Sequence, residues 1–473
     1  MHVKNLLLVF LCLFPVLGIG ASKIRVACIG NSITFGSGIS EREKNAYPAQ
    51  LQLLLGERYE VKNWGVSGTT VLFKGDSPYV NTSEYIQSKA FQPDIVLIKL
   101  GTNDTKPQNW KYNHSFMDDY QRLIDAYKAL DSHPRIILLT PVRCFLPEDT
   151  GISPQLIENK VRPMIEELAW KNNLEIINLF NLFGDKWDGM LMPDRLHPSS
   201  VGAQRIALKI GRYLQQSGKD NEFVPSQRTS FNFHGFQGYD FVVNNIPCKL
   251  VKPVKAAKGN PWIIRARFWD HEPQVDIELL EHGFHVAYCD VADLYGSPEA
   301  VERWNTFYKY MRNAGFHKKV VLEGMSRGGL IVYNWTAANP SKVSCIYVDA
   351  PVLDIKSWPM GEGGSDEDTR RMMKAYGFKD KAQAIAWKGN PINHVNIIAN
   401  AHIPLIHVVG DADDAVPVKD NTAPFEKMMI EKHGNIKVVH KPDVGHHPHS
   451  LNNPQIIVDF ILRSTGYLSQ DEE

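Results

Sequence analysis

The sequence has few cysteines, and their arrangement excludes two classes of protein. Six occur in 473 residues, and one of them, Cys12, lies in the apolar N-terminal segment. The others are odd in number and include no Cys-x-x-Cys pair. This pattern argues against a disulfide-rich scaffold and against a structural zinc site built from cysteines.

The sequence also has no excess of charge of either sign. Its 52 basic and 52 acidic residues give a formal net charge of zero. Electrostatic attraction therefore favours neither nucleic acid nor an anionic membrane as a partner. Beyond the N-terminal segment, no apolar run approaches the roughly 20 residues that a membrane-spanning helix needs. What remains is an ordinary globular composition, long enough for two or three domains.

The first 21 residues have the pattern of a secretory signal peptide. Lys4 precedes an apolar stretch at 6–17, and small residues follow at 18–21. This order of a basic, an apolar and a small-residue segment is typical of cleaved export signals. We therefore expect residues 1–21 to be a signal peptide and the protein to be secreted or periplasmic. A membrane anchor is the alternative, but the apolar run is short for a span.

Residues 22–216 alternate between short apolar runs and longer helical patterns. The expected strands cover residues 24–29, 61–64, 95–100, 136–140 and 175–178. Strands that alternate with helices predict a parallel, doubly wound sheet of the flavodoxin-like kind. In such a sheet the ligand crevice lies at the carboxyl ends of the strands.

Residues suited to acyl transfer follow these strands. Ser32 comes after the first strand, Gly65 after the second and Asn103 after the third, while Asp194 and His197 share a loop before the last helix. An Asp three residues before a His can bind its Nδ1 and leave Nε2 free to take the serine proton. The Gly65 N–H and the Asn103 side chain offer donors to a developing oxyanion.

Four sequence blocks in this region resemble, in the same order, the signature blocks of SGNH (GDSL-type) esterases. They are Gly30-Asn31-Ser32-Ile33-Thr34, Asn63-Trp64-Gly65-Val66-Ser67-Gly68, Gly101-Thr102-Asn103-Asp104 and Asp194-Arg195-Leu196-His197-Pro198. The resemblance covers about residues 23–216. It implies that Ser32 is the nucleophile, that Gly65 and Asn103 complete the oxyanion hole, and that His197 with Asp194 is the base pair. Asn31 stands where the name-giving pattern has Asp, a variation common among carbohydrate-directed members.

A polar stretch at 217–230 separates this domain from a second one at 231–473, where strand and helix patterns alternate again. An apolar run at 320–322 leads into Gly324-Met325-Ser326-Arg327-Gly328, followed by a helix-capable segment. A Gly-x-Ser-x-Gly turn between a strand and a helix holds its serine on a strained backbone and exposes Oγ. Ser326 is therefore a second candidate nucleophile.

Candidate partners for Ser326 follow it in the order acid, then base. Asp413 lies three residues past Gly410, with Asp414 as the close alternative, and His446 follows Gly445, with His447 second. Residues 231–465 resemble the α/β-hydrolase superfamily, whose triads have this chain order. The expected fold class is therefore α/β, with two doubly wound domains.

The resemblance leaves the oxyanion hole of the second domain less well defined. One donor is expected to be the N–H of Arg327, the residue after the nucleophile. The other is expected from the backbone of Phe268 or Trp269, in the turn after the strand at 262–268. This turn has no HGGG-like run.

Two side chains near Ser326 suit substrate binding. The Arg327 guanidinium could clamp a substrate carboxylate, although pairing with Glu323 or Asp349 is the plainer interpretation. Trp358, in an expected cap at 354–388, could stack on a sugar face. The histidines at 446, 447 and 449 do not predict a metal site, because the sequence shows no second cluster to complete one.

The sequence thus predicts a secreted or periplasmic two-domain serine esterase. By resemblance to exported bacterial carbohydrate esterases, the first domain is expected to remove O-acetyl groups from carbohydrate and the second to cleave a different ester. No cofactor, metal or nucleic-acid partner is expected, and the oligomeric state is not predicted. Alternatives are lipase, lysophospholipase or peptidase activity in one domain, or one silent, glycan-binding domain.

Overall fold

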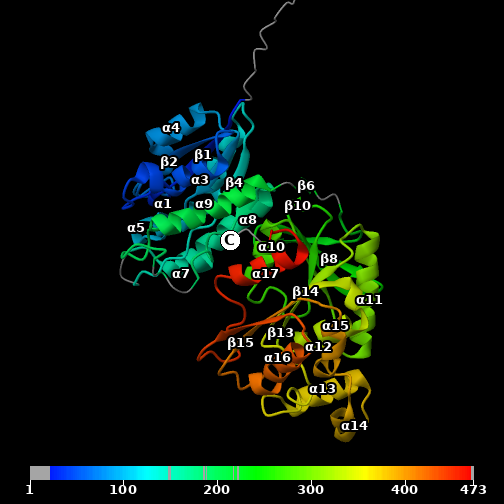
Figure 1. The fold of residues 1–473 in the computed structure, drawn as a ribbon. Coiled ribbons are helices and arrows are strands. Elements are labelled where there is room, and N and C mark those ends of the chain that lie inside the picture. The colour runs from blue at the N-terminus through cyan, green and yellow to red at the C-terminus, as the bar shows by residue number, and fades with distance from the viewer. Residues whose placement is uncertain are drawn as a thin grey trace, which may run out of the picture.

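The protein is described by a computed structural model over residues 22–147, 151–184, 187, 189–216, 218–220 and 223–469. The expected signal peptide at 1–21 lies outside these residues, as does part of the expected linker at 217–230. Two α/β units, each built on its own sheet, follow one another in the sequence and pack against each other (Figure 1).

The sheet of the first unit has five parallel strands in the order β2-β1-β3-β4-β5. They are β1 (Ile24–Gly30), β2 (Tyr59–Gly65), β3 (Ile95–Lys99), β4 (Arg135–Leu139) and β5 (Glu175–Ile177). All five overlap the strands expected from the sequence, and the order is the expected flavodoxin-like one. It places β1 between β2 and β3, so the loops after these strands lie side by side.

Alternate residues of the central strand face two different helical layers. Val26 and Cys28 pack into a cluster with α3 and α9, whereas Ala27 and Ile29 belong to a cluster with α6 and α8. Because side chains alternate across a strand and both faces are covered, the strands read as nearly continuous apolar runs. These helices are α3 (Tyr47–Leu55), α6 (Phe116–Lys128), α8 (Arg162–Asn172) and α9 (Ser200–Gln215).

The second unit contains a mixed sheet of nine strands in the order β16-β15-β14-β13-β11-β12-β9-β8-β7. The edge made by β7, β8 and β9 is antiparallel, and the other strands run parallel to one another. The strands are β7 (Thr229–Phe233), β8 (Phe236–Val243), β9 (Ile246–Lys252), β11 (Trp262–Arg265), β12 (His285–Cys289), β13 (Val320–Met325), β14 (Val343–Asp349), β15 (Leu405–Gly410) and β16 (Ile436–Lys441). The α/β fold class expected from the sequence is confirmed. However, β7 begins at Thr229, inside the stretch expected to be a linker.

Helices cover both faces of the second sheet. Side chains of α10 and α17 pack on one face, and those of α11, α12, α15 and α16 pack on the other. The helices are α10 (Gln274–Glu281), α11 (Pro298–Asn313), α12 (Gly328–Ala338), α15 (Val395–Asn400), α16 (Thr422–Glu431) and α17 (Gln455–Thr465). The expected cap at 354–388 contains two further helices, α13 (Asp366–Tyr376) and α14 (Lys381–Ala386), which lie together at one end of the molecule (Figure 1).

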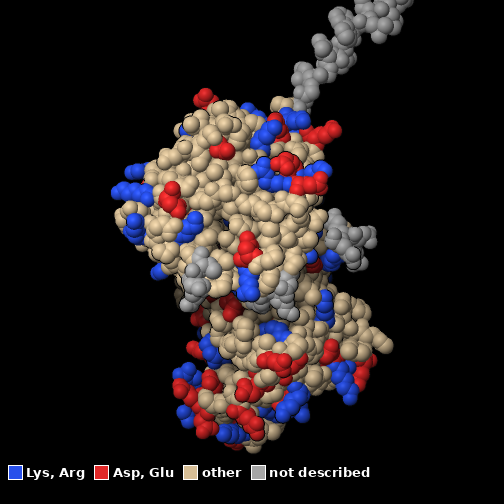
Figure 2. Space-filling view, turned by 90° about the vertical axis from the view of Figure 1, so that its left-hand side faces the viewer, with Lys and Arg blue, Asp and Glu red and all other residues tan. Residues whose placement is uncertain are grey.

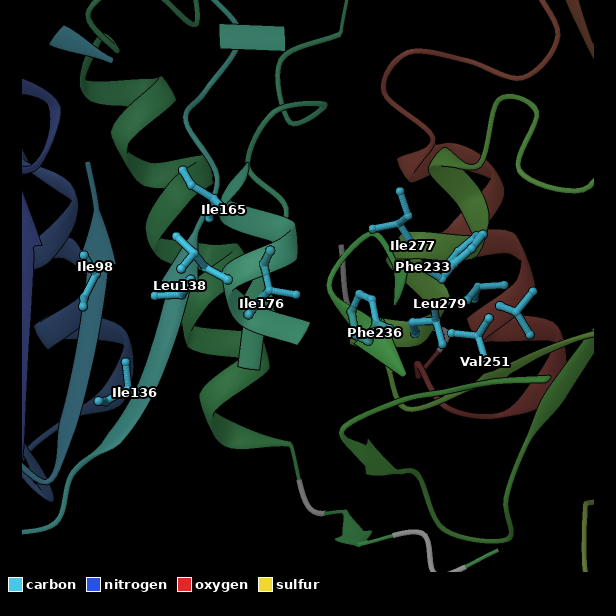
Figure 3. Close-up of a cluster of buried hydrophobic side chains, with 14 of the residues drawn as sticks. Ile98, Ile136, Leu138, Ile165, Ile176, Phe233, Phe236, Val251, Ile277 and Leu279 are labelled. Atoms are coloured by element: carbon cyan, nitrogen blue, oxygen red, sulfur yellow. The ribbon is translucent and has the colours of Figure 1, made fainter. Parts of the chain in front are cut away.

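The two units share a packed interface of apolar and ionic contacts. Ile176 of β5 faces Phe236 of β8 across the boundary (Figure 3), and a Cβ added to Gly235 would approach Ile176 to 2.9 Å. Beside them, the buried Lys209 ammonium of α9 forms ion pairs with Glu278 and Glu281 of α10, the latter at 3.1 Å. The first unit therefore rests directly on the second.

Two further observations concern surface charge and helix character. Basic and acidic residues intermingle on the second unit in the view of Figure 2, without a broad area of one sign. Among the helices of the described residues, none combines the length and the apolar character that crossing a membrane requires.

Candidate active sites

The loop after β1 presents Ser32 at the start of the short helix α1 (Ser32–Phe35). The Asn31 side chain accepts a hydrogen bond from the Ile33 N–H at 3.2 Å and so caps this turn. A Cβ at Gly30 would lie 2.1 Å from Thr34 Oγ1 and 2.8 Å from the Lys99 carbonyl oxygen. The Gly-Asn-Ser sequence is therefore what allows the serine to follow the strand so closely.

The structure brings Ser32, His197 and Asp194 together. His197 Nε2 lies 2.8 Å from Ser32 Oγ, and His197 Nδ1 lies 2.6 Å from Asp194 Oδ2. The other Asp194 oxygen accepts backbone N–H bonds from Leu196 and His197, each at 3.0 Å. Partial burial opposes ionisation of Asp194, but these hydrogen bonds outweigh it and hold its pKa below the usual value. A charged Asp194 can orient His197 as a base for Ser32.

One of the two oxyanion donors expected from the sequence is occupied in this structure. The Gly65 N–H donates to Asn63 Oδ1 at 2.9 Å, so it is not free for a substrate oxygen. Among the described residues, the N–H of Gly68 in the same loop has no hydrogen-bond partner, and Gly68 has a φ of 83°. Asn103 Nδ2 bonds the Thr69 carbonyl at 3.0 Å, which places the expected side-chain donor beside Gly68. The Asn63 bond therefore makes Gly68 a second candidate for the backbone donor beside the predicted Gly65.

Two charged groups are buried beneath this site. Burial lowers the pKa of Lys99 to about 7, and its Nζ has no hydrogen-bond partner among the described residues. Burial raises the pKa of Asp104 to about 7, although Asp104 Oδ1 accepts the N–H groups of Val71 and Leu72 at 2.9 Å each. Asp104 thus ties the loop after β2 to the loop after β3.

In the second unit, Ser326 occupies a strained turn between β13 and α12. Its φ is 51°, in the left-handed region that side chains other than glycine rarely adopt. A Cβ at Gly324 would lie 2.8 Å from Val332 Cγ2, so only glycine lets the helix pack this close to the strand. The geometry is the one that a Gly-x-Ser-x-Gly elbow requires.

The structure brings Ser326, His446 and Asp413 together. His446 Nε2 lies 3.0 Å from Ser326 Oγ, and His446 Nδ1 lies 2.7 Å from Asp413 Oδ2. Asp413 is buried, and its Oδ1 accepts the N–H groups of Ala415 and Val416. The alternatives Asp414 and His447 are exposed and lie outside this chain of hydrogen bonds.

A buried arginine holds the loop that follows β11. Arg265 bonds the carbonyl oxygens of Phe268, at 3.0 Å, and His271, and it pairs with Glu323 at 2.9 Å and with Asp276. Among the described residues, the N–H groups of Phe268 and Arg327 have no hydrogen-bond partner. Both expected donors therefore remain available to an oxyanion, and Arg265 positions the first of them.

Arg327 pairs with the cap rather than with Glu323 or Asp349, the partners considered from the sequence. Its Nη1 lies 3.5 Å from Asp368 Oδ1 and 3.4 Å from Tyr295 Oη. The guanidinium also lies over the rings of Phe268, Tyr295 and Trp358, at 5.5–5.9 Å from their centroids. Trp358 stacks on Tyr295, so both residues expected to bind substrate belong to one cluster beside Ser326.

A second arginine, which the sequence reasoning missed, joins this cluster. Arg267 lies over the Phe268 ring at 5.1 Å and pairs with Asp293 at 3.6 Å. Burial and the nearby charge of Arg327 lower its pKa. Two guanidinium groups, each paired with an aspartate, therefore lie around the Phe268 ring near Ser326.

Two hollows in the described part of the chain lie beside the triads and not over them. One of about 730 Å³ is lined by Phe35, Trp64 and Gly65, close to the loop of Ser32. Another of about 590 Å³ is lined by charged and small residues of the cap and of the loop after Asp413. Neither hollow includes a triad residue in its lining.

Comparison with known proteins connects both parts of the chain to hydrolase families. Residues 28–205 match the GDSL-like Lipase/Acylhydrolase family, and residues 295–470 match the Prolyl oligopeptidase family. The first range contains Ser32 and His197, and the second contains Ser326, Asp413 and His446. Each hydrogen-bonded triad therefore falls within one family match.

An acetylxylan esterase of Xylanibacter ruminicola is 43% identical over 204 residues, which cover 39% of this chain and 42% of that protein. Among solved structures, Est1E from Butyrivibrio proteoclasticus has 17% identity and a TM-score of 0.35, covering 51% of this chain and 100% of that one. Porphyromonas gingivalis dipeptidyl peptidase 4 has 14% identity and a TM-score of 0.39, covering 48% and 35%. At these TM-scores the two structural likenesses support no conclusion about function.

Proposed function

Because the chain joins a domain of the GDSL-like lipase/acylhydrolase family to one of the prolyl oligopeptidase family, both serine hydrolases, we propose that it is a two-site carbohydrate esterase. The Ser32 site removes O-acetyl groups from carbohydrate. We infer this substrate from one observation, which is that the relative matching the first domain is named acetylxylan esterase. The pattern of residues 1–21 supports secretion or export to the periplasm.

Both sites are suited to the same two-step chemistry. The serine Oγ attacks the ester carbonyl while the histidine Nε2 takes its proton, and the oxyanion is held by N–H donors. The histidine then protonates the departing alcohol oxygen, and an acyl-serine remains. Water, deprotonated by the same histidine, attacks the acyl carbon, and the serine leaves with the proton. The assignments of Ser32, His197 and Asp194, and of Ser326, His446 and Asp413, rest on the hydrogen bonds described above.

The second site is proposed to cleave a different ester, and its surroundings favour acidic carbohydrate. Arg327 and Arg267 offer guanidinium groups that bind a carboxylate through two hydrogen bonds, and Trp358 offers a ring face to a sugar. If a uronate is clamped in this way, Arg327→Ala raises KM for esters that carry a free uronate and leaves neutral esters unchanged. Tight binding of uronate esters by this variant would contradict the clamp.

Single-site variants separate the two activities. We expect Ser32→Ala to abolish acetate release from acetylated xylan, and Ser326→Ala to abolish cleavage of a methyl or feruloyl glycan ester. Ser226→Ala, at an exposed serine, is the matched control. A fluorophosphonate should label Ser32 and Ser326, and labelling of only one would indicate that the other domain is a binding module. Full acetate release by both single variants would refute the proposal.

A second candidate function concerns the Ser326 domain alone. Its match to the Prolyl oligopeptidase family favours peptidase activity over lipolysis as the alternative. Release of p-nitroaniline from peptide anilides, lost in Ser326→Ala and kept in Ser32→Ala, would establish this function in place of the second esterase activity.

A further inference from the structure

Three histidine rings that neither triad uses meet beside the Ser326 site. His271, His447 and His449 each offer one ring nitrogen, and these nitrogens lie within 4.8 Å of one another. The His447 and His449 centroids are 4.7 Å apart, and each lies 5.8 Å from that of His271. His447 and His449 belong to the loop of His446, whereas His271 belongs to the loop of Phe268. The cluster thus joins the two loops that frame the catalytic serine.

The buried member of the cluster has the hydrogen bond that metal-binding histidines usually have. His449 is 3% exposed, and its Nδ1 lies 2.7 Å from Oδ1 of the buried Asp349. The second oxygen of Asp349 accepts the Ser450 N–H at 2.8 Å, which fixes the carboxylate. Because a carboxylate accepts, Nδ1 of His449 carries the proton, which leaves Nε2 as the nitrogen that can bind a metal. This second partner orients a ligand and raises its basicity.

The other two rings are exposed, and the backbone that carries one of them is held in place. Arg265 bonds the His271 carbonyl, while the rings of His271 and His447 reach solvent. A tetrahedral zinc ion with Zn–N bonds of about 2.0–2.1 Å needs ligand nitrogens roughly 3.4 Å apart. The present spacing of up to 4.8 Å is wider. Small rotations of the two exposed rings toward His449 would close the difference.

We propose that His271, His447 and His449 form a binding site for a divalent transition-metal cation such as Zn²⁺. Three imidazole nitrogens with a fourth position open to water suit zinc, and imidazole is a poor ligand for Mg²⁺ or Ca²⁺. A bound ion links the loop that carries Phe268 to the loop that carries His446. It therefore keeps the Phe268 N–H, the expected oxyanion donor, at a fixed position relative to His446, the expected base.

Metal content tests this site independently of either esterase activity. The full chain is stripped with a chelator, dialysed against limiting ZnCl₂ and measured for bound zinc. We expect one zinc per chain in the parent and none in the His271→Ala/His447→Ala double variant, whose substitutions are at exposed positions. His114→Ala, an exposed histidine of the first unit, is the matched control and should keep the ion. Addition of Zn²⁺ should raise the melting temperature of the parent and not that of the double variant.

The triad histidine must also be separated from the site, since its ring centroid lies 5.0 Å from that of His447. We expect His446→Ala to keep the zinc. A parent chain without zinc, or a double variant that retains it, would refute the proposal. Loss of zinc in His446→Ala with retention in His271→Ala would assign the ion to the triad and refute it as well.

Discussion

The guanidinium of Arg327 forms an ion pair with Asp368 at 3.5 Å, which links the residue after Ser326 to helix α13 of the cap. Tyr295 donates a hydrogen bond to the same carboxylate at 3.0 Å. A substrate carboxylate that binds Arg327 must therefore compete with Asp368. Under the proposed function, the cap thereby contributes to the specificity of the second site.

This competition predicts the effect of Asp368→Asn. Removing the negative charge frees Arg327, so KM for an ester with a free uronate should fall, by up to about fivefold for a partly exposed pair. KM for a neutral ester should not change. Asp366→Asn, on the same helix and exposed, is the control. Steady-state kinetics in a Ser32→Ala chain measure both values, and an equal change for neutral and acidic esters would contradict the competition.

The acid of the second triad is predicted to be Asp413. Asp413→Asn keeps the shape of the side chain but removes the carboxylate that orients His446, so kcat should fall by roughly 10⁴-fold. Asp414→Asn changes the neighbouring exposed carboxylate and should leave kcat nearly unchanged. The two variants are compared in a Ser32→Ala chain with the same ester. A similar loss in both would show that the hydrogen bond to His446 does not identify the acid.

Replacing the buried Lys99 by an apolar residue is predicted to stabilise the fold by an amount that depends on pH. Its folded-state pKa of about 7 lies below the unfolded value of 10.5, so the unfolded chain binds more protons between these values. Lys99 therefore destabilises the fold most at and below pH 7, and this cost disappears as pH rises toward 10.5. Lys99→Met should increase the free energy of unfolding by about 1–3 kcal/mol at pH 7.

Denaturant unfolding at several pH values measures this effect. The gain of Lys99→Met over the parent should shrink as the pH rises above 7. Lys62→Met, at an exposed position of β2, should show no such trend. A gain for Lys99→Met that is independent of pH would mean that the ammonium is not the destabilising group.

The ion pairs at the interface between the two units predict that Lys209→Met strongly lowers the stability of the fold. Two buried carboxylates, on Glu278 and Glu281, would lose their counter-ion, which costs about 3–5 kcal/mol for a buried pair. Burial already raises the pKa of Glu281 to about 8, even though the Lys209 charge opposes the shift. Without Lys209 that folded-state pKa rises further. The loss should therefore be smaller at acid pH, where the carboxylates are protonated, and grow as pH increases.

Thermal unfolding at two pH values checks this prediction. Arg205→Met, at an exposed position of the same helix, is the control. The triple variant Lys209→Met/Glu278→Gln/Glu281→Gln should recover part of the stability, because it leaves no charge at these three positions. If Lys209→Met alone unfolds like the parent, the ion pairs do not stabilise the interface.

Local patterns were sufficient to predict most of the strands and the contact between Asp194 and His197, whereas the other triad partners came from the family resemblance. Strands β1, β3 and β4 of the first sheet are largely apolar runs, and Asp194 and His197 are close enough in sequence for their contact to be inferred from spacing. The elbow at Ser326 is likewise a local motif, since its glycines are required by the turn itself. Such features depend on neighbours within a few residues, which a sequence displays directly.

The remaining features depend on contacts between distant segments. His271 and His447 meet only because β11 and the loop after β16 end at the same edge of the sheet, and no spacing indicates this. Asp368 likewise reaches Arg327 only through the fold. The cap helix α13 did carry a local signal, because the Ser365 hydroxyl accepts the Asp368 N–H at 3.0 Å in a helix-capping arrangement.

The close approach of Gly235 to Ile176 has a practical consequence for anyone who wants only one of the two domains. Cutting the chain near residue 223 would uncover Ile176 and Phe236 and leave Lys209 without its acidic partners. Each fragment would then expose an apolar surface and unpaired charged side chains to solvent, and would tend to aggregate. A preparation with a single activity is better obtained by silencing one serine in the intact chain than by truncation.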